Sequence, residues 1–329
     1  SRLSGKRKNF SLQDSIRPLL LAGLRMLEER FGQPVPLGYA YPAILYACAE
    51  FDVNFRLPGA EHEEFARDLR KVHGFIRDEG DYAEFRDLAD TLNKTHVKSV
   101  RAPLARVLAN RHTGLLPLAL AAPEAMLTDN QKRRMAALPA PPVGAGTDDE
   151  KRQALLDLWL SQSLAAGSVL VEGTPSEWID STDGPALKRS SGRHTALLEK
   201  LLTSRWHRSQ FGANAKPDAS WIDFLTTTFA QNHNAKGFFI NAAKVRLRPE
   251  SEVDWRRCGH CTLAQPTNML MGVTCVKCGK DTDPLDPRQD TVFRSRKYLY
   301  RKLVERLEAE GDQGYVPYPF VAEEHTAQL

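Results

Sequence analysis

Four cysteines in two closely spaced pairs constrain this sequence more than any other feature. Cys258 and Cys261 form the first C-x2-C pair, and Cys275 and Cys278 form the second after thirteen intervening residues. Two residues between cysteines make a tight turn that brings both sulfurs to one ion, and Zn²⁺ accepts four thiolates as a tetrahedron. We expect a strand before the first pair and a returning strand after it. The spacing therefore predicts a zinc ribbon that holds a structural Zn²⁺.

Other interpretations of these cysteines fit the sequence less well. Disulfides or redox thiols are alternatives, but five cysteines in 329 residues are too few for a secreted disulfide framework. Catalytic zinc needs an open coordination position, which four thiolates do not leave. His260 lies inside the first turn and is an alternative ligand. Gly259 and Gly279 are expected to supply the backbone freedom of the two turns. Cys48 lies in an apolar stretch and is predicted to be buried.

Composition places the chain among globular proteins. Its 329 residues suffice for two or three domains, and 42% hydrophobic with 26% charged residues argue against bulk disorder. The apolar run 115–122 is much shorter than the roughly 18–20 residues of a membrane-spanning helix. No apolar region of a signal peptide follows the basic N-terminus. We therefore predict a cytoplasmic protein without a membrane association.

Hydrophobic spacing predicts a mostly α-helical fold with a small β region. We expect no strand of convincing length before residue 165, because no period-two alternation occurs there. Strands are expected over 168–172, 237–241 and 244–248, with an edge strand over 315–322. Helices are expected between 11 and 32, from 42, and over 61–76, 84–92, 100–110, 150–165, 194–206, 220–230 and 297–310.

A segment rich in Pro, Gly and Ala divides the chain. Its residues, 139–149, are predicted to form a linker or a long surface loop, because they suit neither a helix nor a central strand. The pattern changes again near residue 244. The predicted parts are a helical domain (1–138), the linker, a second helical region (150–243), the zinc ribbon (244–290), and a helix and strand of an α/β domain (291–329).

Positive charge is concentrated around the cysteines. Residues 244–302 hold thirteen Lys and Arg against seven Asp and Glu, whereas 303–329 hold one Arg against six acids. Cations interleaved with Phe293, Tyr298 and Tyr300 suit phosphate contact and base stacking. The alternative is a ribbon that braces a domain junction, with its cations solvated. The predicted nucleic-acid-binding residues are Arg256, Arg257, Lys277, Lys280, Arg294, Arg296, Lys297 and Arg301.

No motif of a complete enzyme occurs in the sequence. The phosphate-binding patterns G-x-x-x-x-G-K-[ST] and G-x-G-x-x-G are absent, as are H-E-x-x-H and G-x-S-x-G. Asp148 and Asp149 lie in the predicted linker without a preceding strand, so they do not form a Walker B motif. Glu323, Glu324 and His325 are adjacent, but their chemistry alone favours a polar loop. We therefore predict no catalytic residues in this chain.

Residues 255–329 nevertheless resemble a known family. They resemble the zinc-containing region of large bacterial superfamily 2 helicases, especially the helicase subunits of DISARM-type phage-defence systems. The resemblance implies that His325, Thr326 and Gln328 belong to a helicase-motif loop, and that 291–329 begins a RecA-like domain. The motifs that carry it are Trp255-Arg-Arg-Cys-Gly-His-Cys, Cys275-Val-Lys-Cys-Gly, Leu285-Asp-Pro, Phe293-Arg-Ser-Arg-Lys, Tyr300-Arg and Glu323-Glu-His-Thr-Ala-Gln-Leu.

On this resemblance the chain is a segment of an ATP-dependent DNA helicase or translocase. ATP and Mg²⁺ would be cofactors of the longer protein, an ATP hydrolase whose motor motifs lie outside this sequence. The helices and the ribbon would contact DNA or a companion defence-system subunit. The alternative is a stand-alone zinc-ribbon adaptor that binds a protein partner and has no motor activity.

Overall fold

Helices make up most of the fold, as the sequence predicted. A computed structural model describes residues 12–309 except 111, 142–143, 180–186, 188–189, 192–218 and 235–236. The expected helix 194–206 and strand 315–322 lie outside the described residues. The described helices are α1 (Leu12–Phe31), α2 (Ala40–Glu50), α3 (Ala60–Arg77), α4 (Tyr82–Leu92), α5 (Lys98–Ala109), α6 (Asp129–Ala136), α7 (Asp148–Ala165), α10 (Ala219–Phe229) and α11 (Thr291–Ala309).

Three small sheets join these helices. In the first, β1 (Ala121–Ala125) pairs antiparallel with β6 (Val245–Pro249). In the second, β5 pairs with β2, β3 and β4, and in the third β7 lies between β8 and β9. Their bounds are β2 (Val169–Leu170), β3 (Ser190–Ser191), β4 (Ala230–Asn234), β5 (Gly237–Asn241), β7 (Trp255–Cys258), β8 (Ala264–Pro266) and β9 (Thr282–Leu285).

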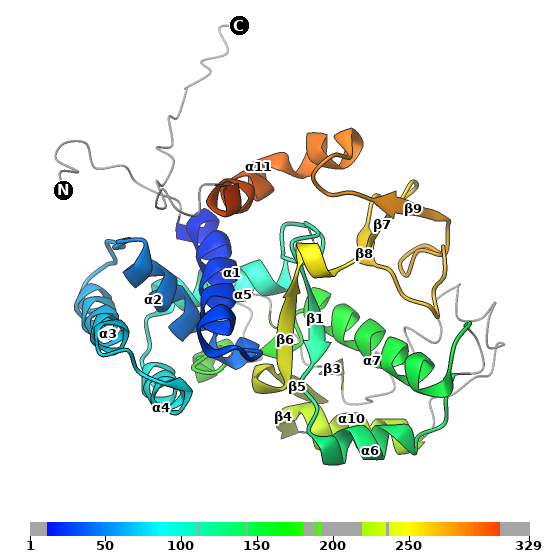
Figure 1. Cartoon of the computed structure of the whole chain (residues 1–329), viewed down its shortest axis with the longest axis horizontal. Helices are drawn as coiled ribbons and strands as arrows, with labels where there is room; N and C mark the ends of the chain where they lie inside the picture. The colour runs from blue at the N-terminus through cyan, green and yellow to red at the C-terminus, as the bar shows by residue number, and fades with distance from the viewer. Residues whose placement is uncertain are drawn as a thin grey trace, which may run out of the picture.

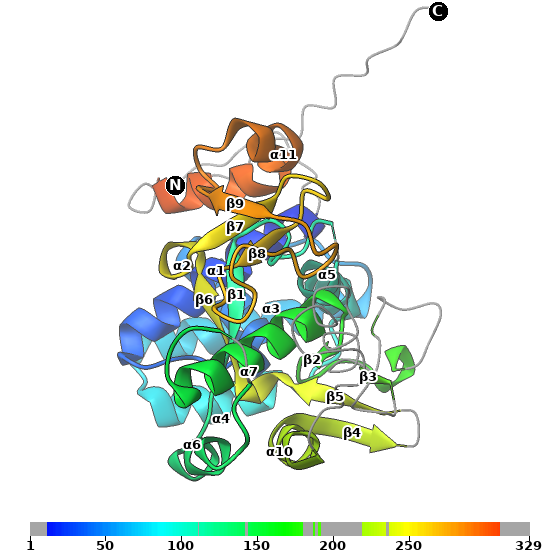
Figure 2. The ribbon, with the colours of Figure 1, turned by 90° about the vertical axis from the view of Figure 1, so that its right-hand side faces the viewer.

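The helices α1 to α5 lie on one side of the molecule, and the third sheet lies on the other (Figure 1). Helix α11 runs along the top between them, and Figure 2 shows β7 to β9 between α11 and α7. One hydrophobic core extends from Ile16 in α1 to Leu307 in α11 and takes residues from both sides of 139–149. The two predicted helical regions therefore share a core across that segment.

Helix α2 lies at the centre of the helical side and is buried from Ala40 to Cys48. An α-helix that is apolar all round needs neighbours on every face. Helix α1 meets α2 closely at Gly23, where a Cβ would lie 1.9 Å from the Ala43 carbonyl oxygen. Burial raises the pKa of the Cys48 thiol. The prediction that Cys48 is a buried apolar residue is confirmed.

Some predicted boundaries were wrong. Strand β1 precedes residue 165, although Ala121–Ala125 shows no alternation, because β6 supplies its hydrogen-bonding partner from distant sequence. Helix α7 begins inside the predicted linker, where Thr147 and Glu150 form a capping box. Helix α11 begins at Thr291, six residues earlier than expected, so only the α11 part of 291–329 is described. None of the described helices is long and apolar enough to cross a membrane.

Two glycine substitutions test the packing of α1 on α2. We expect Gly23→Ala to destabilise the protein by about 2–3 kcal/mol, because its methyl group would overlap the Ala43 backbone. Gly74→Ala in α3 is the matched control, since no atom lies within 4 Å of its Cβ position. Alanine there should stabilise the helix by about 0.5–1 kcal/mol. Chemical denaturation measures both changes, and equal effects would contradict the close approach.

Candidate metal centre

The four cysteine sulfurs form one cluster in the third sheet. All four Sγ atoms lie within 4.8 Å of one another, and the pairs Cys258–Cys278 and Cys261–Cys275 are each 3.5 Å apart. A disulfide needs about 2.05 Å, so the thiols are free. Four sulfurs at about 2.3 Å from a tetrahedral Zn²⁺ lie about 3.8 Å apart. The cluster therefore fits one tetrahedrally bound ion.

The two cysteine turns have the same backbone hydrogen bonds. The Cys258 N–H donates to Leu263 O at 3.0 Å, and the Thr262 N–H donates to Cys258 O at 3.0 Å. In the second turn the Cys275 N–H donates to Lys280 O at 2.8 Å, and the Gly279 N–H donates to Cys275 O at 2.9 Å. Each turn is thus a self-contained loop that presents two sulfurs. We call these the first turn (258–263) and the second turn (275–280).

A left-handed residue completes each turn. In the second turn this residue is Gly279, with a φ of 67°, as its type predicted. In the first turn it is Thr262, with a φ of 58°, and Gly259 is not among the residues with positive φ. The prediction for Gly259 was wrong, because the left-handed position comes four residues after the first cysteine of each pair, not one. A β-branched residue is strained in this conformation.

Ionisation of the cluster depends on a cation. Burial opposes ionisation of Cys258, but the N–H groups of Cys261 and His260 that donate to its sulfur lower its pKa to about 7. Burial raises the pKa of Cys275. Four adjacent thiolates repel one another unless a positive ion lies between them. The donor set thus favours a thiophilic metal ion such as Zn²⁺, with no fifth position for a reacting water.

Two amides support this cluster, and sequence analysis missed both. Gln265 is buried, accepts from the Val276 N–H at 3.0 Å and donates to Thr274 O at 3.0 Å, which holds the second turn against β8. The buried Asn268 donates to Ala154 O at 2.7 Å and so joins the sheet to α7. Amides between cysteine pairs are a weak sequence signal, because turns are rich in such residues.

The sheet also has a small core of its own. Trp255, Ala264 and Leu285 from its three strands pack with Phe293 of α11. Leu116 and Ala119 before β1, Ala122 in β1 and Val253 before β7 also belong to this core. The part that holds the cysteines, which we call the ribbon (residues 253–285), is therefore attached to the helical side by apolar contacts as well as hydrogen bonds.

Of the predicted nucleic-acid-binding residues, the two arginines beside the first turn are already paired. Arg256 donates to the Thr282 hydroxyl at 2.8 Å and also to the Thr282 carbonyl. Arg257 lies 3.2 Å from the Asp290 carboxylate. Both are half-buried. Their structural contacts hold β7 to β9 and to the start of α11.

The cations of α11 are also largely paired. Arg294 contacts Glu305 at 2.9 and 3.0 Å, although the two are eleven residues apart. A straight helix spans about 16 Å over that distance, so α11 bends, as Figure 1 shows. Lys297 donates to His112 O at 2.7 Å. Burial and the nearby Arg296 lower its pKa.

Arg301 differs from the prediction most clearly. Its side chain is fully buried, donates to Leu118 O at 2.6 Å and to Ala119 O at 3.1 Å, and pairs with Glu250 at 2.7 Å and with Glu305 at 2.9 Å. A guanidinium with these partners cannot reach a phosphate in this structure. Arg301 is therefore a structural cation, and we remove it from the candidate contact surface.

Three of the predicted residues remain exposed and unpaired. Lys277 and Lys280 lie on the second turn, and Arg296 lies on α11. None of the three side chains forms a hydrogen bond or an ion pair with any residue that the structure describes. The predicted helicase-motif residues His325, Thr326 and Gln328 lie outside the described residues.

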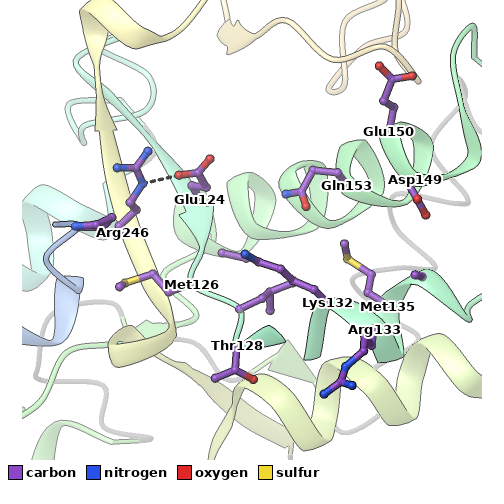
Figure 3. Close-up of a pocket in the computed structure, with 14 residues that line it drawn as sticks. Glu124, Met126, Thr128, Lys132, Arg133, Met135, Asp149, Glu150, Gln153 and Arg246 are labelled. Atoms are coloured by element: carbon purple, nitrogen blue, oxygen red, sulfur yellow. Dashed lines mark hydrogen bonds and ion pairs between the residues drawn. The ribbon is translucent and has the colours of Figure 1, made fainter. Parts of the chain in front are cut away.

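A separate cleft of about 1030 Å³ lies between α6, α7, β1 and β6 (Figure 3). Most of the charged side chains that line this cleft already form ion pairs or cap a helix. Glu124 pairs with Arg246 across the two strands, and the Glu150 carboxylate caps α7. Asp149 pairs with Arg152 at 2.7 Å. These contacts stabilise the fold and leave little chemistry for a ligand.

The comparisons with known proteins add no family. Neither the family models, nor the curated proteins, nor the solved structures gave a match to this chain.

Removing the metal should unfold the ribbon and spare most helices. The ribbon strands pack in the small core around Trp255, whereas the helices share the larger one. We expect one zinc ion per chain. On chelation, the fluorescence of Trp255 should change, whereas the helical circular dichroism signal should be largely retained. Cys275→Ser should abolish stoichiometric zinc, and Cys48→Ala is the control that keeps it. Full zinc content in Cys275→Ser would contradict a four-cysteine site.

The left-handed position predicts opposite effects in the two turns. Thr262→Gly should stabilise the zinc-loaded protein by about 0.5–1 kcal/mol, because glycine adopts this φ without strain. Gly279→Thr should cost about 1–2 kcal/mol for the same reason. Thermal unfolding of the loaded proteins measures both. Destabilisation by Thr262→Gly would show that the threonine side chain supports the turn.

Proposed function

We propose that this chain is a zinc-dependent DNA-contact module of an ATP-dependent helicase or translocase in bacterial phage defence. Four thiolates hold Zn²⁺ as a structural ion, and the metal shapes the second turn. Lys277 and Lys280 on that turn and Arg296 on α11 contact the phosphate backbone. The observation that carries the proposal is that these three cations are exposed and unpaired while the surrounding cations are paired.

Physical chemistry supports phosphate contact over base reading. Exposed ammonium and guanidinium groups bind phosphates without sequence preference and release counterions. Tyr298 and Tyr300 lie on α11 with Arg296 and are 41% and 40% exposed. Arg294 and Arg17 each lie over one of these rings, so stacking on bases would use the exposed part that remains. The proposal therefore predicts sequence-tolerant and salt-sensitive binding.

The helicase context rests on the resemblance of residues 255–329. In that context ATP hydrolysis belongs to other parts of a longer polypeptide, and the helical side of this chain shapes the DNA path. The mass of the native polypeptide that contains this sequence, measured from the source cell, tests this point. A polypeptide no longer than these 329 residues would exclude a motor, whereas a longer one with ATP-binding motifs would support it.

One observation favours the adaptor as a second candidate. Leu299 of α11 is 81% exposed, and Val292 of the same helix is 47% exposed. Exposed apolar side chains on a helix suit contact with a protein partner. As a stand-alone adaptor, the chain would then bind a protein partner through α11 and need no DNA.

Charge removal tests the DNA contact. We expect the triple variant Lys277→Gln, Lys280→Gln, Arg296→Gln to bind a DNA duplex at least about tenfold more weakly at low salt. The slope of log affinity against log salt should fall by about two to three, since each phosphate contact contributes about 0.9. Fluorescence anisotropy of the zinc-loaded protein at several salt concentrations gives both quantities.

The matched control removes the same charge elsewhere. Arg56→Gln, Lys94→Gln and Arg133→Gln change three exposed cations away from the ribbon and should leave the slope unchanged. Equal losses in both triple variants would indicate non-specific attraction. No loss in either, together with a stoichiometric partner that resists nuclease, would replace DNA binding by the adaptor function.

A further inference from the structure

A pocket of about 570 Å³ lies where the ribbon meets the helical side. Its walls come from α7, from β1 and β6, from β8 with both cysteine turns, and from α11. Small-molecule sites are concave, about 300–1,000 Å³ in size, and mostly apolar with a few polar groups. This pocket has that size, and its lining combines apolar side chains with a similar share of polar and charged ones.

The polar group that distinguishes the pocket is Arg248 of β6. Its Nε atom is fully buried and has no hydrogen-bond acceptor. The guanidinium forms no hydrogen bond or ion pair with any residue that the structure describes. A buried N–H without an acceptor is costly, so an anion that accepts from the Arg248 Nε atom would be bound favourably. Its neighbour on the same face of β6, Arg246, is paired with Glu124 in the cleft of Figure 3.

A second polar group lines the same pocket from α7. The Asp157 carboxylate accepts one hydrogen bond from Gln153 at 2.8 Å, and a carboxylate has room for more. Burial raises its pKa to about 6, although Gln153 and the charge of Arg248 oppose the rise. Asp157 and Arg248 do not form an ion pair with each other. The pocket thus offers one site for an anion and a second for a hydrogen-bond donor.

The remaining walls define the body of the ligand. Leu116, Leu158 and Val276 line the pocket with apolar surface, which suits a flat ring. Lys277 and Lys297 line it as well and add positive charge to that of Arg248. Two further cations suit a phosphate, which carries up to two negative charges, better than a single carboxylate.

We propose that this pocket binds a nucleoside monophosphate. Its phosphate pairs with Arg248, its base packs on the apolar walls, and an amino or imino N–H of the base donates to Asp157. Lys277 belongs both to this pocket and to the proposed DNA-contact surface. Arg248 and Asp157 belong to the pocket alone, so variants at these two residues test the nucleotide site separately from DNA binding.

Calorimetry on the zinc-loaded chain tests the proposal, with AMP and dAMP as probes and adenosine and inorganic phosphate as partial ligands. We expect AMP or dAMP to bind more tightly than either part. Arg248→Gln should weaken binding by at least about tenfold, since a charge-assisted hydrogen bond is lost. Arg246→Gln is the control, which removes the same charge from the same strand face and should leave the affinity unchanged.

Folding and binding are separable in these variants. Without nucleotide, Arg248→Gln should unfold at the same or a higher temperature than the parent, because it removes the buried Nε–H that has no acceptor. Absence of nucleotide binding by the parent would overturn the proposal. Equal weakening by Arg246→Gln would also overturn it, and unchanged binding in Arg248→Gln would place the nucleotide elsewhere. If inorganic phosphate bound as tightly as AMP, the site would recognise an anion and not a nucleotide, which would also overturn the proposal.

Discussion

A single buried guanidinium joins the parts on which the metal centre depends. Arg301 of α11 donates to the carbonyls of Leu118 and Ala119, and pairs with Glu250 just before the ribbon and with Glu305 on its own helix. Breaking a buried ion pair by removing one partner costs about 3–5 kcal/mol. The positions of α11, of the segment before β1 and of the ribbon are therefore set together.

Hydrogen bonds and apolar contacts join the metal centre to the helical side. The cysteine turns define the ribbon locally, but Asn268 binds α7 and the ribbon tryptophan packs beside α11. Two other buried arginines act in the same manner elsewhere: Arg17 donates to Thr113 O and Tyr300 O, and Arg101 donates to the carbonyl of Glu172. Buried backbone carbonyls need donors, and in these places long cations supply them.

Sequence reasoning worked where the chemistry is local. The cysteine spacing predicted the cluster because each pair forms within one turn, and apolar periodicity predicted most helices. It failed for β1, whose partner β6 lies more than a hundred residues away. It also failed for Arg301, although helical spacing places this residue on the same stripe as Phe293 and Val304. The pocket beside α7 was not predictable, because its walls come from distant segments.

The first and second turns of the metal centre differ in the conformational strain of their backbones. Both turns use the same hydrogen bonds, but a threonine occupies the left-handed position of the first and a glycine that of the second. The first turn therefore keeps its shape against a conformational penalty that the second does not carry. The backbone strain of the centre is therefore concentrated at one residue, Thr262, whose φ a glycine would adopt without penalty.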